Sequence, residues 1–268
     1  MRDDGGGVSG GQLARTLAGT AGLVGTVQVL PAVLGVPGVP DRFPGLTGPT
    51  RPGWIGLTFD DGPHPEGTPA VLDQLARAGV SATFFVLGEQ LFQQPDLGWR
   101  IAEQGHELAV HGWHHRPLPM MRPGRIGREL ADTCDLLTDI TGVTPRWYRP
   151  PYGVATTEAL YAAARLGLRP VWWNRWGRDW SAAATPARIT GTVLGHAASR
   201  RRRLRGGDVV LLHDSDAYAL AGSWRRTAAA IPLILDQAAR WGLCAGSLES
   251  AGSPSVEPIR TAAPRPPR

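Results

Sequence analysis

The sequence predicts an α/β fold, a distorted barrel of about seven strand–helix units with a parallel sheet inside. From Trp54 onward, short apolar runs alternate with segments of helical periodicity. The runs are almost continuously apolar, which is typical of strands covered on both faces. The connections between them are short, and this number of units favours a barrel over an open sheet. A chain of 268 residues is long enough to form such a barrel as one domain.

The first strand begins at Trp54 and runs into two adjacent carboxylates, Asp60 and Asp61, before Gly62-Pro63 ends it. The following helix begins at Thr68-Pro69, an N-cap residue followed by proline at the first helical position, and ends at Gly79. The next elements expected in order are a strand over 81–86, a helix over 96–104 and a strand over 106–111.

The middle of the chain continues the alternation. Apolar residues at helical spacing predict a helix from Ile126 to Thr141, with Gly142 as its stop. A short strand over 146–149, a helix over 157–166 and a strand over 169–173 follow.

The last units begin at Thr185-Pro186, a second N-cap and proline signal, which predicts a helix to about Ala198. A strand of the fully buried type is expected next, over 208–213. A final helix with Pro232 near its start is expected to run to Trp241, followed by a closing strand over 243–245.

Three segments are expected along the chain: an N-terminal segment over 1–50, a catalytic domain over 51–250 and a disordered Pro/Arg-rich tail over 251–268. Residues 16–40 carry no charge, and three interpretations of them stay open. They form a helix packed on the domain, a membrane anchor or uncleaved signal, or a disordered stretch. Membrane association through this run is therefore left open.

The charge is basic, with a formal net charge of +5 and all 28 basic residues being arginine. This balance permits acidic partners and selects none. The arginine run over 200–205 could bind phosphates, but we interpret it as a solvated helix end and expect no nucleic-acid function. Cys134 and Cys244 lack metal-site spacing and are expected to be buried thiols.

Polar residues fall where the predicted strands end. The pair Asp60 and Asp61 requires a nearby cation, because two close carboxylates repel; taken alone, the pair could also be a solvated turn. His111, Arg149, Asp179 and His213 occupy equivalent positions after or at the ends of later strands. Because the carboxyl ends of barrel strands open on one face, we expect all these residues to converge there.

His111 and His115 have the spacing of one helical turn and could hold one metal ion. Together with Asp61 they give two imidazoles and one carboxylate with open positions, typical of catalytic zinc and of non-haem iron. His114 is expected to point elsewhere. His64, His106 and His196 are also interpreted as structural.

The stiff segment 149–153 is either an ordinary loop or functional. In the functional interpretation Arg149 neutralises and orients Asp60, and the Tyr152 backbone N–H faces a developing oxyanion. Asp179 and Trp180 add a carboxylate and an aromatic wall, and His213 suits a general acid.

Five motifs together resemble the polysaccharide deacetylase (NodB-like) family, a type of carbohydrate esterase, over residues 54–248. They are TFDDG (58–62), HxxxH (111–115), RPPYG (149–153), RDW (178–180) and LLHD (211–214). The resemblance implies a distorted barrel and a metal-dependent N- or O-deacetylase. Two positions depart from the family pattern: Gly112 stands where the family usually has Ser or Thr, and Trp176 where it often has an acid.

The resemblance also implies roles for individual residues. Asp60 would be the general base with Arg149 as its partner, and His213 the general acid. Asp179 would be a supporting carboxylate. The implied metal ligands are Asp61, His111 and His115, and the implied substrate-binding residues are Pro151, Tyr152, Trp180 and Leu211.

The function expected on these grounds is hydrolysis of acetyl groups from N-acetylated or O-acetylated carbohydrate, such as a glycan containing N-acetylglucosamine. One divalent ion would be the cofactor, zinc first, with cobalt, manganese or nickel as alternatives. The alternative functions are cleavage of another non-peptide C–N bond, an iron oxygenase and an inactive glycan-binding homologue. The substrate class favours the cell envelope, while the absence of a clear signal peptide leaves a cytoplasmic location open.

Overall fold

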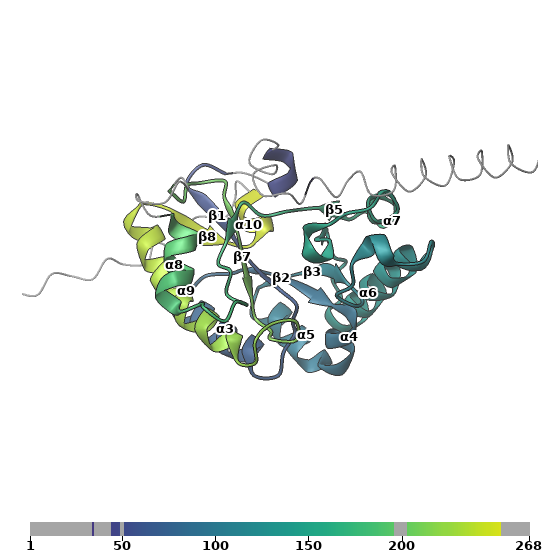
Figure 1. Ribbon diagram of the computed structural model, residues 1–268, viewed down its shortest axis with the longest axis horizontal. Coiled ribbons are helices and arrows are strands. Elements are labelled where there is room, and N and C mark those ends of the chain that lie inside the picture. Colours follow the sequence, from purple (N-terminus) through teal and green to yellow (C-terminus); the bar gives the residue numbers. More distant parts are fainter. Residues whose placement is uncertain (1–33, 35–43, 49–50, 196–202, 253–268) are drawn as a thin grey trace, which may run out of the picture.

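The computed structural model describes residue 34 and residues 44–48, 51–195 and 203–252 (Figure 1). Within these residues an eight-stranded sheet follows the order β5-β4-β3-β2-β1-β7-β6, and β8 pairs with β1. Every pairing is parallel. The strands are β1 (Trp54–Asp60), β2 (Thr83–Leu87), β3 (Glu107–Gly112), β4 (Trp147–Tyr148), β5 (Arg169–Pro170), β6 (Arg175–Trp176), β7 (Val209–His213) and β8 (Cys244–Gly246).

The central strand, β1, is buried along its whole length. Its carboxyl end pairs with β2 on one side, its amino end pairs with β8, and β7 accompanies it from Gly56 to Asp60. Phe59 stacks on Phe84 of β2 at 5.2 Å between ring centroids. This burial explains why the sequence of β1 is apolar without alternation.

The two edge strands, β5 and β6, do not pair with each other. The residues that join them cross the gap instead: the Val171 N–H donates to Tyr148 in β4, and the Asn174 N–H donates to Val209 in β7. The sheet is therefore a curled, incompletely closed barrel, which confirms the predicted class. The expected strand over 169–173 is shorter than predicted, because only its first two residues pair as β5.

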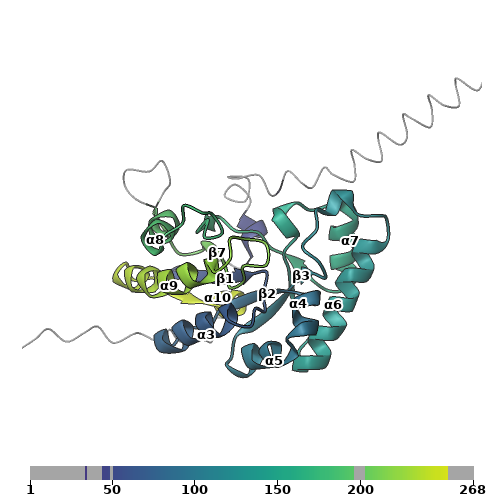
Figure 2. The ribbon, with the colours of Figure 1, turned by 60° about the horizontal axis from the view of Figure 1, so that its bottom comes forward.

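Helices surround the curled sheet (Figures 1 and 2). Helix α3 packs on α9 and α9 on α8 along one side, while α6 packs on α5 and α7 along the other. The α-helices are α3 (Gly67–Ala78), α4 (Gly88–Gln93), α5 (Pro95–Glu103), α6 (Arg125–Thr141), α7 (Thr157–Arg165), α8 (Pro186–Leu194), α9 (Ser223–Arg240) and α10 (Leu248–Gly252). Short 3₁₀ turns are η2 (Pro44–Thr47), η3 (Leu118–Met120) and η4 (Pro151–Gly153).

Several predicted helix ends are confirmed. Gly79 and Gly142 end α3 and α6 in left-handed backbone conformations. Thr185 caps α8 by accepting a hydrogen bond from the Arg188 N–H. The expected N-cap role of Thr68 is wrong, because Thr68 lies inside α3 and its hydroxyl donates to Asp214.

Other boundaries differ from the sequence prediction. Helix α8 ends at Leu194 rather than near Ala198, and Pro232 lies in the middle of α9 rather than near its start. Helix α4 and strand β6 were not predicted.

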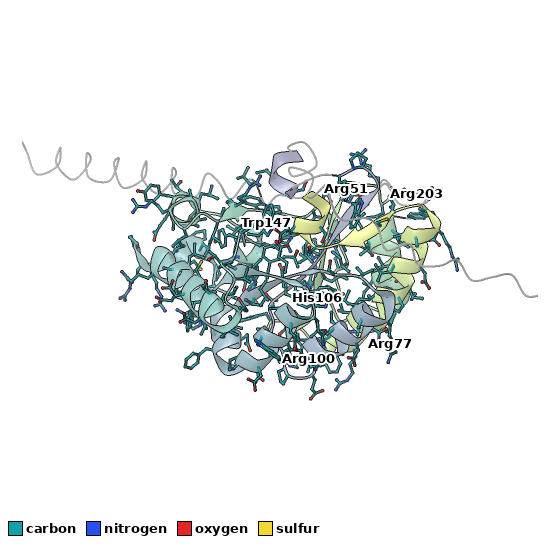
Figure 3. All side chains as sticks on the ribbon, turned by 180° about the vertical axis from the view of Figure 1, so that it is seen from behind. Arg51, Arg77, Arg100, His106, Trp147 and Arg203 are labelled. Atoms are coloured by element: carbon teal, nitrogen blue, oxygen red, sulfur yellow. The ribbon has the colours of Figure 1, made fainter. Side chains whose placement is uncertain are left out.

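Some predictions fall outside the described residues: those for the N-terminal segment apart from the short pieces above, for His196, for 200–202 and for the tail beyond Gly252. Arg203 and Arg205 are not helical, so the helix-end interpretation is wrong for them, and Arg203 stacks on Trp241 at 3.7 Å. Arg77 and Arg203 lie at the molecular surface (Figure 3). Both cysteines are free thiols, with Cys134 buried and Cys244 partly buried. Among the described helices, none has the length and apolar character needed to cross a membrane.

Candidate active site

The two adjacent carboxylates separate at the end of β1. Asp60 is the last residue of the strand, and Asp61 adopts a left-handed backbone conformation (φ +75°) that turns the chain away. Both are buried, with exposures of 3% and 5%. Each carboxylate consequently faces a different partner.

Asp61 faces two imidazoles. Its Oδ1 lies 3.4 Å from His111 Nε2 and 3.5 Å from His115 Nε2. The ligand atoms that the three residues offer lie within 4.8 Å of one another. Asp61 Oδ1 is buried and has no hydrogen-bond partner among the described residues. A cation between the three side chains would satisfy this oxygen, so the residues fit a divalent metal ion.

The protonation states suit metal ligation. The Nδ1–H of His111 donates to the Arg149 carbonyl at 2.8 Å, which leaves the Nε2 lone pair directed at Asp61. Burial lowers the pKa of His115 to about 4 despite the nearby Asp61 carboxylate, so its imidazole is neutral. Burial would raise the pKa of Asp61, but the surrounding imidazoles of His111, His213 and His115 hold it well below its usual range.

The two histidines meet without a helix, so the helical-turn explanation of their spacing is wrong. His111 lies in β3, and His115 lies in the loop beyond Gly112, whose φ of +117° redirects the backbone. Their rings lie 5.2 Å apart. His114 points elsewhere, as predicted, and contacts Glu89 at 2.6 Å.

Asp60 pairs with Arg149. Their side chains meet at 2.7 Å, and the same Nη1 donates to Thr58 Oγ1 at 2.8 Å. The Arg149 side chain is fully buried, and its guanidinium stacks on the Phe85 ring at 4.0 Å. Arg149 therefore fixes the orientation of Asp60, whose Oδ2 lies 3.8 Å from His111 Nε2.

A second ion pair lies beside the first. His213 ends β7 in register with Asp60, and its Nδ1 lies 2.8 Å from Asp179. Asp179 also accepts hydrogen bonds from the His213 backbone N–H and from Thr227 Oγ1. Burial opposes the charged imidazolium, but Asp179 outweighs it and raises the pKa of His213 to about 10. The free Nε2 of His213 lies 4.0 Å from Asp61 Oδ2.

The predicted substrate-binding residues lie partly at the rim of the site and partly below it. Tyr152 has a left-handed backbone (φ +58°), and its half-exposed ring lies 4.2 Å from the His115 ring. Trp180 stacks on Trp176 at 4.5 Å and contacts His213 edge-on. Pro151 and Leu211 are buried below this rim, in η4 and β7.

Two residues near the site were missed. The ring of Tyr218 lies 4.7 Å from the His115 ring, and its hydroxyl donates to Glu89 at 2.5 Å. Neither residue belongs to a recognisable motif, and no local pattern signals them. Only the fold brings the β7–α9 loop next to α4.

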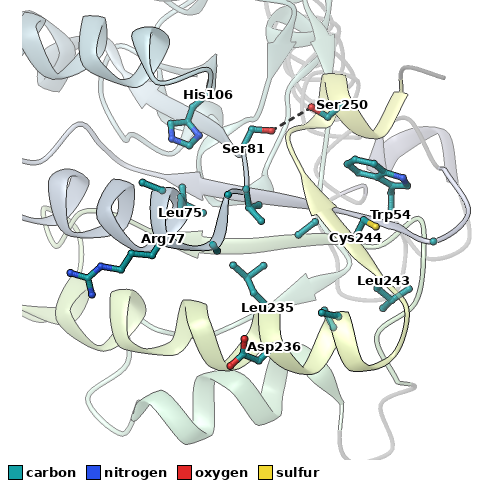
Figure 4. Close-up of a pocket in the computed structure, with 18 of the residues that line it drawn as sticks. Trp54, Leu75, Arg77, Ser81, His106, Leu235, Asp236, Leu243, Cys244 and Ser250 are labelled. Carbon is teal, nitrogen blue, oxygen red and sulfur yellow. Dashed lines mark hydrogen bonds between the residues drawn. The ribbon is translucent and has the colours of Figure 1, made fainter. Parts of the chain in front are cut away.

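A wide hollow of about 1220 Å³ lies at the other end of the sheet, near the amino ends of β1 and β8 (Figure 4). It is lined by Trp54, Leu235 and His106, among other residues, and Figure 4 shows these side chains around the opening. Burial lowers the pKa of His106 to about 4, and its Nδ1 accepts the Ala82 N–H. His106 is therefore structural, as predicted, and the hollow is separate from the carboxylate site.

Comparison with known proteins identifies the family. Residues 47–171 match the profile described as polysaccharide deacetylase. A chitooligosaccharide deacetylase from Bradyrhizobium sp. (strain ANU 289) is 39% identical over 159 residues, which cover 59% of this chain and 69% of the relative. The chain belongs to the polysaccharide deacetylase family.

Two further polysaccharide deacetylases are similar over more of the chain. A peptidoglycan-N-acetylglucosamine deacetylase from Bacillus cereus is 32% identical over 196 residues, covering 73% of this chain and 68% of the relative. The crystal structure of the Bc1960 peptidoglycan N-acetylglucosamine deacetylase superimposes with a TM-score of 0.68 at 30% identity. That superposition covers 77% of this chain and 91% of the other. The NodB-like fold implied by the sequence motifs is thereby confirmed.

Proposed function

We propose that this protein is a hydrolase that removes acetyl groups from an N-acetylated carbohydrate, with a glycan containing N-acetylglucosamine as its substrate. The observation that carries the proposal is the placement of two ion pairs, Asp60–Arg149 and Asp179–His213, beside the cluster of Asp61 with two imidazoles. The names of the relatives support the substrate class, since they act on chitooligosaccharide and on peptidoglycan N-acetylglucosamine.

Asp61, His111 and His115 would hold one divalent ion. Imidazole and carboxylate ligands suit zinc, and cobalt, manganese or nickel are compatible alternatives. When bound, such an ion polarises a carbonyl oxygen and lowers the pKa of a water molecule to about 7.

Asp60 would act as the general base. The Oδ1 of Asp60 accepts a hydrogen bond from Arg149. The Oδ2 of Asp60 faces the ligand cluster, where it can accept a proton from the attacking water. Because Arg149 is fully buried and also bound to Thr58, the base is held in one orientation. The Tyr152 N–H would donate to the developing oxyanion.

His213 would act as the general acid. Asp179 holds its Nδ1 and favours the imidazolium, so the proton at Nε2 is available for the leaving amine. Leu211, Pro151 and Trp180 would enclose the acetyl group beside it.

The alternatives differ in what they leave unexplained. An iron oxygenase would give the Asp60–Arg149 and Asp179–His213 pairs no acid–base task. An inactive glycan-binding homologue would not need these buried charges. Hydrolysis of another non-peptide amide, or of an acetyl ester, uses the same groups and is the nearest alternative.

Acetate release tests the proposal. The full chain, loaded with zinc, should release acetate from N-acetylglucosamine oligomers or from peptidoglycan glycan strands. Treatment with a chelator should abolish release, and added zinc should restore it. Full turnover after verified removal of the metal would contradict the mechanism. Release from acetyl esters alone would change the substrate class.

The pH profile tests the role of His213. Asp179→Asn removes the charge that raises the pKa of His213, so that pKa should fall. Since a general acid must be protonated, the alkaline limb of kcat/KM should move to lower pH. Asp208→Asn is the matched control, because Asp208 is also a buried aspartate in an ion pair, but its partner is Arg175 and not His213. An alkaline limb that stays in place in Asp179→Asn would remove His213 from the role of acid.

A further inference from the structure

We propose that Tyr218 is a substrate-binding residue that holds the sugar ring next to the one losing its acetyl group, and that Glu89 positions it. The inference rests on the proposed function and extends it to a second ring of the substrate. Neither residue belongs to the five sequence motifs.

Tyr218 lies directly beside the ligand cluster. Its ring centroid is 4.7 Å from that of His115, and its side chain is 43% exposed. Tyr152 also contacts His115 and is 54% exposed. Two tyrosine rings therefore contact His115, and both remain open to solvent at the rim of the site.

Glu89 holds the Tyr218 ring in place. The Tyr218 hydroxyl donates to Glu89 Oε1 at 2.5 Å, and His114 Nδ1 lies 2.6 Å from Glu89 Oε2. The Glu89 backbone N–H donates to the Trp113 carbonyl at 3.0 Å. Glu89 therefore joins α4, the loop after β3 and the loop before α9, and it gives His114 a positioning task.

The loop that carries Tyr218 is fixed at two further points. Asp214 accepts a hydrogen bond from Thr68 in α3, and Asp216 lies 3.0 Å from His64 Nε2. The Nδ1 of His64 accepts the Gly67 N–H at 3.0 Å, so Nε2 carries the hydrogen that faces Asp216. A loop anchored in this way presents its aromatic ring in one orientation before substrate binds, which favours affinity.

The chemistry of the exposed ring fits a carbohydrate. One face of a pyranose is lined with C–H groups, and a tyrosine ring offers a flat apolar surface with a polar tip. The Tyr218 hydroxyl, which donates to Glu89, is the polar tip of this ring. If the acetyl group reaches the ligand cluster, its own sugar lies against His115, and the neighbouring sugar extends to the rim where Tyr218 lies.

The test compares short and long substrates. The full chain is assayed with N-acetylglucosamine and with its linear pentamer, as wild type, Tyr218→Ala, Tyr218→Phe and Glu89→Gln. Tyr161→Ala is the matched control, since Tyr161 is an exposed tyrosine on α7. Binding of the pentamer to the chelator-treated protein is measured by calorimetry, which is independent of turnover.

Tyr218→Ala should lower kcat/KM for the pentamer about tenfold, through KM, and leave the monomer within roughly twofold of wild type. Its affinity for the pentamer should fall by about the same factor. Tyr218→Phe and Glu89→Gln, which keep the ring but release its anchor, should fall between wild type and Tyr218→Ala. The control should match wild type.

Equal losses on monomer and pentamer, or unchanged affinity for the pentamer, would overturn the inference while leaving the proposed function intact. Absence of acetate release from every substrate would overturn the function. In that case a loss of pentamer affinity in Tyr218→Ala would still support the binding role of Tyr218, and its absence would refute it.

Discussion

Replacing Asp60 with asparagine is expected to lower turnover by about 10²–10⁴-fold, the usual loss for a removed general base. Asparagine has nearly the same shape and still offers an acceptor to Arg149, but it cannot take the proton from water. The three side chains of the ligand cluster are unchanged, so the metal should remain. Single-turnover acetate release from zinc-loaded protein measures the chemical step directly.

Excess metal is the control condition, because it should not restore the turnover of Asp60→Asn. A residual rate within tenfold of wild type would show that another group accepts the proton. Addition of a small external base, such as azide or formate, offers a second check, because it could replace the lost carboxylate at the vacated position.

Arg149→Met is expected to lower the free energy of unfolding by about 3–5 kcal/mol. Arg149 is fully buried, and its removal leaves the Asp60 carboxylate buried without its cation. Methionine can occupy part of the space over Phe85 but supplies no charge or donor. Urea unfolding of the full chain, monitored by tryptophan fluorescence, measures the change.

The matched control is Arg146→Met. Arg146 pairs with Glu249 at 2.6 Å, but the two side chains are 67% and 54% exposed. Solvent screening reduces the contribution of such a pair to about 0–1 kcal/mol. Equal unfolding free energies for the two variants would mean that burial of the Asp60–Arg149 pair has no special effect on stability.

The strands of the fold could be predicted because their burial is visible in the sequence. Strand β1 is buried on both faces, and its apolar run ends at the two carboxylates where the structure ends it. The same holds for β7, whose apolar residues lead to His213. Because the strands are parallel, their carboxyl ends lie at one face, and the predicted polar residues lie there together.

Predictions from local sequence were wrong where contacts between residues far apart in the chain determine the structure. Thr68 has the sequence context of an N-cap, but its hydroxyl is taken by Asp214, 146 positions away. The segment from Val171 to Asn174 crosses between sheet edges through backbone hydrogen bonds, which leave no residue pattern. The spacing of His111 and His115 correctly suggested a shared site, although the positive φ of Gly112 brings them together rather than a helical turn.

Tyr218 and Glu89 show the limit of motif reasoning at the site itself. They lie 129 positions apart and meet only because the β7–α9 loop reaches α4 in the folded chain. Loops position the residues that contact substrate at the rim of the site, whereas the ends of the strands position the reacting groups.

The most direct test of the account is the metal content of Asp61→Asn measured beside that of Asp60→Asn. Both proteins are equilibrated at the same free zinc concentration and analysed by elemental mass spectrometry, with wild type as reference. Asp61→Asn removes the only anionic group of the ligand cluster, so it should lose its zinc, while Asp60→Asn should retain one ion per chain. Loss of zinc from Asp60→Asn with retention in Asp61→Asn would contradict the assignment of ligand and base.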